Sequence, residues 1–188
     1  MKRQDVYSCV YTLRCTKKWR FFIIMKTKEM IYGAILTSLA LLIPLAFGGF
    51  LGITIPPFSA TLASHVPVMI AMAISPLTAF AVASGSALGF LIKLGPVIAA
   101  RAGMHIVFGV TGALLYKKGM SFSKVLLVTL PLHALSEALI VIPFGFDLYK
   151  AGVVIGIGTG IHHILDSFIT LFLAAVLVKG SILSIRIK

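Results

Sequence analysis

The chain has 188 residues and a formal net charge of +12, and hydrophobic residues make up 59% of it while charged residues make up only 12%. A soluble domain carries about a quarter charged residues because its surface faces water, so this composition excludes an ordinary soluble domain. Repeated apolar stretches of roughly 20 residues are typical of helices that cross a bilayer. The long run 153–178 lacks the alternation of a barrel strand, so we predict an all-α integral membrane protein.

The first 24 residues are basic and precede the first long apolar stretch. We predict that 1–24 is an N-terminal extension outside the fold, that Met25 is the natural start, and that 25–188 is one six-helix membrane domain. Cys9 and Cys15 lie in the basic segment and indicate neither a disulfide framework nor a metal site. Lysine and arginine beside membrane spans contact lipid headgroups, so the charge predicts a lipid bilayer as partner and not nucleic acid.

Six apolar segments follow in chain order. The first is 30–47, and after it comes an outer segment, 50–64, in which Pro56 and Pro57 break any regular helix. The second span is too short to cross a bilayer without help from its flanks, and the others are long. The basic clusters at 117–124 and at the C-terminus fall on the side of the basic N-terminus if there are six spans, with both termini in the cytoplasm. The later predicted spans are 65–74, 77–94, 97–116, 122–142 and 151–178.

Small residues recur at four-residue spacing, which lets helices approach closely in lipid. In most places we expect these residues to pack helices of the same chain together, as at Gly85 and Gly89 and at glycines 152, 156 and 160. The first helix is the exception, because its small face is a candidate surface for docking another membrane protein. The predicted docking residues are Gly33, Ala34, Thr37 and Ser38.

Ionisable residues inside a span are costly in lipid and commonly mark a site or a pathway. Here they occur in pairs four residues apart, which places both members on one helix face. At a rise of about 1.5 Å per residue, most of them lie in the outer half of the membrane, which predicts a blind cavity open to the exterior. Arg101 is the strongest candidate because a guanidinium holds a carboxylate through two parallel hydrogen bonds. The set is Arg101 with His105, His133 with Glu137, His162 with Asp166, the adjacent His163, and His65 at the start of the second span.

The same residues allow three other interpretations. Any buried pair can simply hold helices together, with Arg101 neutralising Glu137 or Asp166. The five histidines with a carboxylate can bind a transition metal, but they are scattered over several helices and no HExxH or paired CxxC motif supports a metal site. An enzyme needs an activated nucleophile, and no nucleophile elbow surrounds Ser64 or Ser136. We therefore predict no enzyme, no metal site and no cofactor.

The stretch from 60 to 76, ATLASHVPVMIAMAISP, with Gly85, Gly89, Arg101 and His105, resembles the substrate-binding S components of energy-coupling factor (ECF) vitamin transporters, the niacin-specific members above all. The resemblance covers about 26–179. It implies a six-helix bundle in a bacterial cell membrane with an outward-facing pocket. It also implies partners: a transmembrane coupling subunit and two cytoplasmic ATPases, which agrees with the absence of a P-loop sequence. Family members dock through an Ala-xxx-Ala face on the first helix, matched here in size by Ala34 and Ser38.

The resemblance implies a small vitamin, with nicotinate favoured. Arg101 is then expected to clamp the carboxylate, a histidine or hydroxyl to meet the ring nitrogen, and Phe50 or Phe58 to cover the ring. There are two alternatives. The substrate is another small vitamin or a transition-metal ion, or the chain is an accessory membrane protein whose polar pairs are only structural. The predicted substrate-binding residues are Arg101, His105, Glu137, His133, His162, Asp166, His65 and Phe58.

Overall fold

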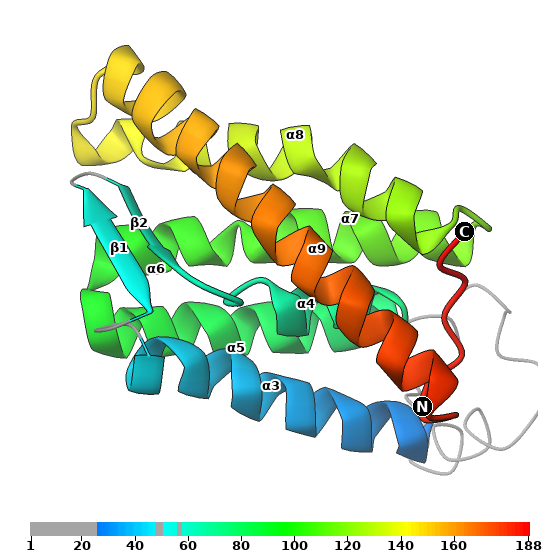
Figure 1. Cartoon of the computed structure of the whole chain (residues 1–188). Helices are drawn as coiled ribbons and strands as arrows, with labels where there is room; N and C mark the ends of the chain where they lie inside the picture. The colour runs from blue at the N-terminus through cyan, green and yellow to red at the C-terminus, as the bar shows by residue number, and fades with distance from the viewer. Residues whose placement is uncertain (1–25, 48–50, 56–57) are drawn as a thin grey trace, which may run out of the picture.

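The structure is a computed structural model, and it describes residues 26–47, 51–55 and 58–188. The predictions about the 1–24 extension, the start at Met25, the two cysteines, Phe50 and the Pro56–Pro57 break lie outside the described residues. The described chain is mostly helical (Figure 1). In chain order its elements are α3 (Thr27–Phe47), β1 (Gly52–Ile55), β2 (Phe58–Thr61), α4 (Val66–Met72), α5 (Pro76–Leu94), α6 (Pro96–Gly103), α7 (His105–Lys117), α8 (Phe122–Ile140), the 3₁₀ turn η1 (Ile142–Phe144), the π-helical segment η2 (Lys150–Ile157) and α9 (Gly158–Lys179).

Within the part of the chain that the structure describes, five helical stretches are long and apolar enough to cross a membrane, and each coincides with a predicted span. Prolines and glycines set their ends. Ser75 caps α5 by accepting a hydrogen bond from the backbone N–H of Thr78, with Pro76 in the first turn. Gly95, at a positive φ of 84°, separates α5 from α6. The five stretches are Thr27–Phe47, Pro76–Leu94, Pro96–Lys117, Phe122–Phe144 and Lys150–Lys179.

The segment after α3 contains a hairpin that the sequence analysis did not predict. Strands β1 and β2 pair antiparallel, with Gly52 opposite Thr61 and Ile55 opposite Phe58. The prediction of irregular structure here followed from the proline pair, and four-residue strands are too short to show a clear alternation. The hairpin lies at the end of the bundle where η1 joins α8 to the last helix (Figure 1).

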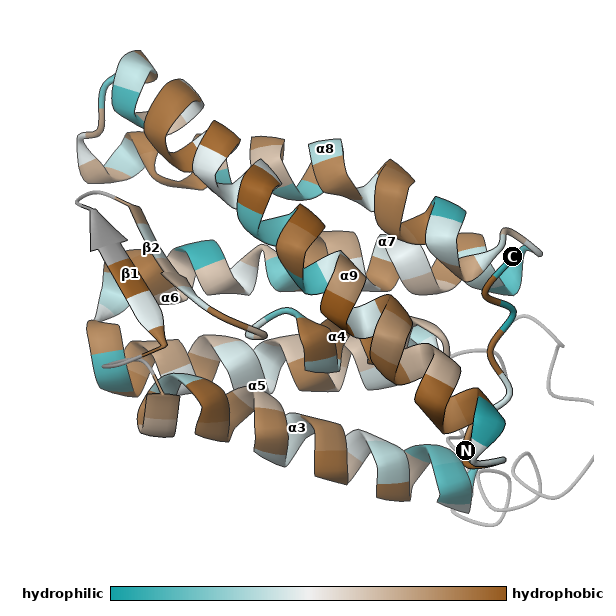
Figure 2. Cartoon of the chain, in the orientation of Figure 1, coloured by the Kyte–Doolittle hydropathy of each residue, from teal (hydrophilic) through white to brown (hydrophobic). Residues whose placement is uncertain are grey.

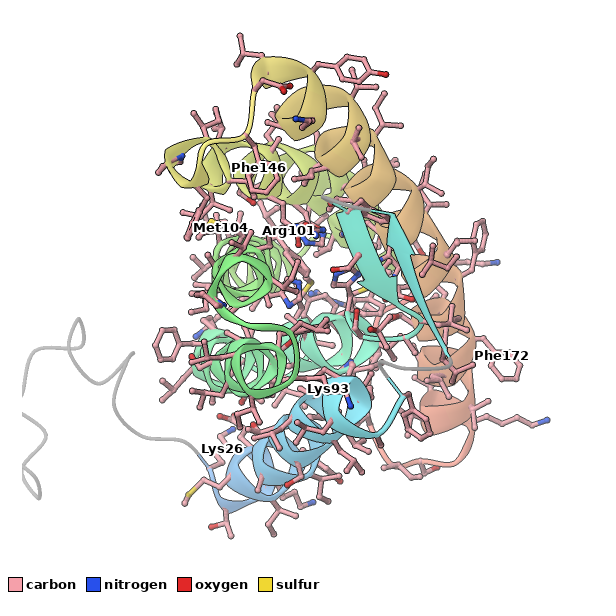
Figure 3. The ribbon with its side chains drawn as sticks, turned by 90° about the vertical axis from the view of Figure 1, so that its left-hand side faces the viewer. Lys26, Lys93, Arg101, Met104, Phe146 and Phe172 are labelled. Carbon is pink, nitrogen blue, oxygen red and sulfur yellow. The ribbon has the colours of Figure 1, made fainter. Side chains whose placement is uncertain are left out.

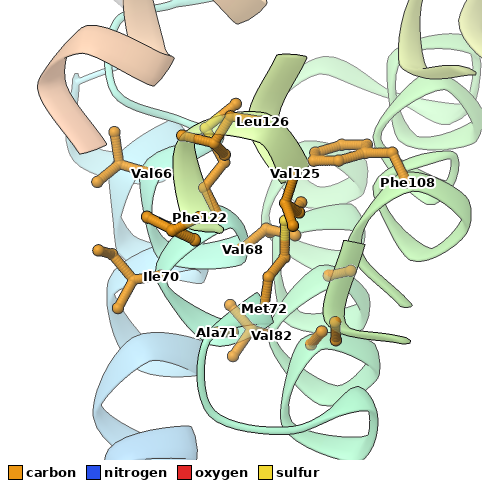
Figure 4. Packing of buried hydrophobic residues seen from close by; sticks show 14 of the residues in the cluster. Val66, Val68, Ile70, Ala71, Met72, Val82, Phe108, Phe122, Val125 and Leu126 are labelled. Atoms are coloured by element: carbon orange, nitrogen blue, oxygen red, sulfur yellow. The ribbon is translucent and has the colours of Figure 1, made fainter. Parts of the chain in front are cut away.

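Helix α4 lies within the predicted second span, 65–74, and all seven of its residues are buried. It packs against α5, α7 and α9, so lipid does not reach it. Two glycines of α7 allow the close approach: a Cβ at Gly109 would lie 2.8 Å from Val68 Cγ1, and one at Gly112 would collide with Met72. Figure 4 shows Val68 and Met72 inside the main apolar cluster, whose members include Phe108, Phe122, Val125 and Leu126.

Helices α3 and α5 pack through the small residues noted in the sequence. A Cβ at Gly85 would lie 2.6 Å from Thr37 Cγ2, and one at Gly89 would lie 2.7 Å from the carbonyl oxygen of Leu41. This pair is therefore an intramolecular contact, as predicted. Of the glycines at 152, 156 and 160, only Gly156 would place an added Cβ within 4 Å of a neighbouring helix, near Ala138 and Ala134.

The exterior of the bundle is apolar and its interior holds the polar groups, which is the reverse of a soluble protein. Figure 2 shows the long helices mainly brown, with hydrophilic residues near their ends and in the middle of α9. Large side chains such as Ile92, Leu127 and Phe168 are about 70% exposed, while His133, His163 and Asp166 are fully buried. Such a surface suits lipid, so we treat the long helices as membrane spans.

The C-terminal segment returns to the bundle end that holds the start of α3. Tyr32 Oη donates a hydrogen bond to the carbonyl of Ile182 (3.0 Å), which ties α3 to the residues after α9. The backbone N–H of Phe122 donates to the carbonyl of Arg186 (2.7 Å), so this segment also caps the start of α8. The start of α3, the α7–α8 loop and the C-terminal segment therefore share one end of the molecule (Figure 1).

Candidate functional site

A small cavity lies beneath the hairpin, and the centre of a water-sized sphere can occupy about 20 Å³ of it. Side chains from β2, the turn before α4, and helices α5, α6, α7, α8 and α9 all reach it. The sequence predicted a blind cavity among the pairs of ionisable residues, and in the structure members of these pairs line one cavity. Its lining residues are Ser59, Ala60, Thr61, Ser64, His65, Phe90, Ile98, Arg101, Ala102, His105, Glu137 and His162.

Arg101 supplies the positive charge of the cavity and is only 4% exposed. Its Nε and Nη2 both donate to Glu137 Oε2, at 3.0 and 2.7 Å, and Nη2 also lies 3.4 Å from the carbonyl of Ser59. Its Nη1 is buried and has no hydrogen-bond partner. Figure 3 shows Arg101 beside the hairpin, whereas Phe172 points away from the bundle. A buried donor without a partner is costly, so this edge of the guanidinium is available for an acceptor.

Glu137 is the negative partner and receives groups from four helices. Thr159 Oγ1 donates to its Oε2 at 2.7 Å, beside the two bonds from Arg101. His133 Nε2 lies 3.2 Å from its Oε1 and His105 Nε2 lies 3.5 Å from the same oxygen. The predicted pair of His133 and Glu137 on one face of α8 is confirmed by this contact.

A chain of imidazoles continues from Glu137 into the core. His133 Nδ1 lies 3.0 Å from His163 Nδ1, and His163 Nε2 lies 3.0 Å from the carbonyl oxygen of Leu126. Because a carbonyl only accepts hydrogen bonds, His163 carries its proton on Nε2. The predicted i,i+4 pairs thus extend into a network between α8 and α9.

Asp166 holds the turn that leads into α4. Its Oδ1 accepts the backbone N–H of Ala63 (2.9 Å) and its Oδ2 that of His65 (3.0 Å). Ala63 has a φ of 66°, a left-handed conformation that is unfavourable for alanine. His162, four residues earlier on α9, adds a contact from its Nε2 to the carbonyl of Thr61 (3.1 Å). Asp166 therefore acts on the backbone of this turn as well as on a side chain.

The ring of His65 lies at the centre of the cluster. Its centroid is 4.7 Å from that of His105 and 4.6 Å from that of His133, both rings standing nearly perpendicular to it. Its Nδ1 lies 3.1 Å from Asp166 Oδ2, but the angles are not those of a hydrogen bond and Nδ1 has no hydrogen-bond partner. His65 is 3% exposed, so water does not satisfy it from the surface.

Phe58 is the aromatic residue that joins the hairpin to the cavity. Its ring centre lies 5.4 Å from Arg101 Cζ, within the range of a cation–π contact. The same ring lies against Gly158, where an added Cβ would come within 2.8 Å of Phe58 Cε2. The hairpin is thus held to both α6 and α9 through this side chain.

All eight of the predicted substrate-binding residues come together, and some contributors were missed. The chain Arg101, Glu137, His105, His133, His65, Asp166 and His162 is continuous, with Phe58 at its edge. Thr159 was not predicted, although it lies one helical turn before His162 and His163 and extends the same polar stripe. Ser59 contributes a carbonyl, which no side-chain pattern reveals, and Ser86 was hidden between two packing glycines.

The predicted docking residues of α3 divide into two faces. Gly33 is buried and Thr37 packs against Gly85 of α5, so these two lie inside the bundle. Ala34 and Ser38 are exposed on the outer face of the helix. Only the second pair is available to another protein.

Comparison with known proteins places these features in a family. The chain is 37% identical over 172 residues to the niacin transporter NiaX of Lactococcus lactis subsp. cremoris (strain MG1363), and the match covers 82% of this chain and 77% of the relative. The chain belongs to the niacin transporter family. No protein-family model matches it, and no solved structure matches it.

Membership of the niacin transporter family confirms several predictions. The resemblance to niacin-specific members, drawn from the 60–76 stretch and Arg101, is borne out by this relative. With its apolar helices, the chain is a multi-pass membrane protein and a transport protein rather than an enzyme. The polar cluster under the hairpin is therefore the candidate substrate site of a transporter.

Proposed function

We propose that this protein is the substrate-capture S component of an ECF-type importer and that it binds nicotinate in the cavity beneath the hairpin. The unpartnered Nη1 of Arg101 carries the proposal, because it is a buried cationic donor at the wall of the cavity. A carboxylate is the ligand group that best satisfies a guanidinium edge. Membership of the niacin transporter family supports a vitamin with that group.

The surroundings of Arg101 suit the rest of a nicotinate molecule. Ser59 Oγ is also buried without a partner, so a second polar group is available close to the carboxylate position. His65 and His105 line the same cavity and offer ring nitrogens that a pyridine nitrogen can meet directly or through water. Phe58, next to the guanidinium, offers an aromatic face to the ring. His133, His162, Glu137 and Asp166 complete the proposed site by holding these residues in place.

The proposed orientation is six crossings with both termini in the cytoplasm of a bacterial cell. Five crossings would leave the start of α3 and the residues after α9 on opposite sides, yet Tyr32 bonds to Ile182. We infer that β2 and α4 together make the additional crossing between α3 and α5. The end that carries the start of α3 is rich in lysine and arginine, which favours the cytoplasm, and the hairpin then faces outward.

The proposed partners are a transmembrane coupling subunit and two cytoplasmic ATPases. The outer face of α3 supports a docking role, because Ala34 and Ser38 form a small exposed patch flanked by the exposed side chains of Ile31 and Ile35. Small residues let a partner helix approach closely in lipid. ATP hydrolysis is left to the partners, since the family resemblance implies no ATPase activity in this chain.

Nicotinate binding to detergent-purified protein tests the capture role directly. Calorimetry with nicotinate, nicotinamide, riboflavin and thiamine is expected to show tight binding of nicotinate alone. Nicotinamide has the same ring without the negative charge, so it reports on the guanidinium contact. Binding of a different vitamin would refute nicotinate as substrate, and a folded protein that binds none would favour a structural accessory role.

The variant Arg101→Lys is expected to weaken nicotinate binding by about 10- to 100-fold, which is the worth of a charged hydrogen bond of 1.5–3 kcal/mol. Lysine keeps a positive partner for Glu137 but loses the free guanidinium edge. Lys93→Ala is the matched control, since Lys93 is an exposed cation on the adjoining helix α5. Unchanged affinity in Arg101→Lys would remove Arg101 from the substrate contact.

A further inference from the structure

We propose that one ring nitrogen of each of His65, His105 and His133, with a carboxylate oxygen of Glu137, binds one divalent transition-metal ion at the floor of the cavity. The four candidate ligand atoms all lie within 4.8 Å of one another and all four residues are buried. Zinc bonds of about 2.0–2.1 Å in a tetrahedron place ligand atoms about 3.3 Å apart. His133 Nε2 and His105 Nε2 lie 3.2 and 3.5 Å from Glu137 Oε1, which is that spacing.

Hydrogen counting along the imidazole chain supports a cation at this point. His163 carries its proton on Nε2, because Nε2 faces the carbonyl of Leu126, so a neutral His163 accepts through Nδ1. His133 must then donate from its own Nδ1, and a neutral His133 keeps a lone pair on Nε2. That lone pair faces the carboxylate oxygen of Glu137 at 3.2 Å, which is repulsive unless an extra proton or a metal ion lies between them.

The surroundings provide the outer contacts that metal-bound histidines usually have. A ligating histidine commonly donates its other ring N–H to a neighbouring acceptor, which fixes its tautomer and orientation. His133 is supported in this way by His163, and His105 Nδ1 lies 3.2 Å from Ser86 Oγ. The rings of His105 and His133 stand at 78° to each other and nearly perpendicular to that of His65, so the three approach one point from different directions.

The charge of the cavity gives a second reason, which rests on the proposed function. Among the described residues, the buried ionised groups are Arg101, Glu137 and Asp166, so with neutral histidines the cluster has a net charge of −1. Adding an anionic vitamin would make the net charge of the cluster −2 in a low-dielectric interior, where uncompensated charge is very costly. A divalent cation bound with nicotinate brings the total to zero.

Asp166 belongs to a second possible ligand group, with His65 and His162, but this group fits a metal less well. Both oxygens of Asp166 already accept backbone N–H groups, and His162 Nε2 faces the carbonyl of Thr61, so that nitrogen carries a proton. The imidazole-rich set favours zinc, cobalt, nickel or copper over magnesium or calcium, which prefer oxygen ligands.

The test is metal binding by the full chain, purified with a tag that contains no histidine and treated with chelator. After dialysis against Zn²⁺, elemental analysis is expected to find one ion per chain, and Co²⁺ is expected to give the visible absorption of a tetrahedral site. His105→Gln and His133→Gln are expected to lose this binding. Lys150→Gln, at an exposed position outside the cluster, is the control, and its metal affinity is expected to equal that of the wild type.

A folded wild-type protein that binds no Zn²⁺ or Co²⁺, or equal binding by all three variants, would overturn the metal site. If the variants do not fold, X-ray absorption of the Co²⁺-loaded wild type decides the matter, since three imidazole ligands are expected and any smaller number contradicts the assignment. Nicotinate binding is measured separately with and without metal. Metal binding without any nicotinate affinity would refute the proposed function alone, whereas equal nicotinate affinity in both states would refute the charge argument alone.

Discussion

At the scale of single residues, Glu137 balances the largest number of buried groups. It faces Arg101, Thr159 and two histidines from four different helices, within a part of the chain that lipid surrounds. A buried ion pair stabilises little compared with an apolar core, but removing one member leaves the other charge uncompensated. The buried ion pair of Glu137 and Arg101 is therefore better evidence for a functional site than for a large net contribution to stability.

Glu137→Gln is expected to destabilise the protein by about 3–5 kcal/mol, because it leaves Arg101 buried without a counter-charge. Thermal unfolding in detergent measures the change. Asp147→Asn is the matched control: Asp147 is exposed, and the amide and ammonium of Lys150 lower its pKa by stabilising the carboxylate. An exposed pair of this kind contributes little, so equal destabilisation in the two variants would contradict the assigned role of Glu137.

The polar residues could be identified from the sequence, but not all of their partners. An i,i+4 spacing correctly placed His133 beside Glu137 and His162 beside Asp166. Arg101 pairs with Glu137, 36 positions away, and Asp166 binds the turn at Ala63. Both contacts depend on how the helices pack against one another, and residue spacing within one helix carries no information about that packing. The sequence predicted no metal site for the same reason, since the histidines are distant in the chain and adjacent only in the fold.

At the scale of elements, the unusual member is α4, a seven-residue helix enclosed by longer ones. Its apolar sequence and its flanking proline and serine predicted a short span, and its full burial follows from the two glycines of α7 that receive Val68 and Met72. The hairpin was not predicted, because its two strands are short and Pro56 and Pro57 stand between them in the sequence. The hairpin and the turn before α4 line the cavity, so the sequence located the long helices better than the parts that close the site.

Gly109→Val is expected to destabilise the protein by about 1–3 kcal/mol, the usual range for overpacking a core. The new side chain would meet the branched Val68, which has little freedom to move away. Gly103→Val, at the preceding helix α6, is the control because a Cβ there has nothing within 4 Å. Thermal unfolding of the two variants is compared, and similar midpoints would show that α4 does not depend on the glycine.

Ala34→Trp is expected to abolish nicotinate uptake by the assembled transporter and to leave binding by the isolated protein unchanged. The bulky ring would obstruct the proposed docking face of α3 without reaching the cavity. Ile92→Trp, at an exposed position of α5, is the control for a large side chain in lipid. Uptake and co-purification with the coupling subunit are measured together; normal uptake in Ala34→Trp would move the docking face elsewhere.

At the scale of the whole molecule, two opposite ends differ in charge and in structure. The start of α3, the α7–α8 loop and the C-terminal segment are joined by hydrogen bonds at the basic end, while the hairpin and η1 form the other. The proposed six-span arrangement, in which β2 and α4 together make one crossing, is consistent with this division. Composition alone was enough to predict the membrane environment, because the preference of a chain for lipid depends on its total apolar area and not on how its helices pack.

The orientation is tested with single cysteines in a background where Cys9 and Cys15 are serine. Lys150→Cys is expected to react with a membrane-impermeant maleimide on intact cells, and Lys118→Cys only after permeabilisation, because lysine-rich loops remain in the cytoplasm. Both positions are exposed at loop ends, so their intrinsic accessibility is comparable. The reverse labelling pattern would invert the proposed topology and place the cavity mouth inside.

The bond between Asp166 and the turn at Ala63 also bears on the order in which the protein assembles. The carboxylate and the two amides that it binds are 103 and 101 positions apart, and His162 reaches Thr61 over 101. Contacts so distant in the chain form only after the intervening helices have been synthesised and inserted. The turn therefore lacks its main support until α9 emerges from the ribosome. Helix α4, made early, can complete its packing only after α9 is in place, and a complete binding cavity exists only once the whole bundle is in the membrane.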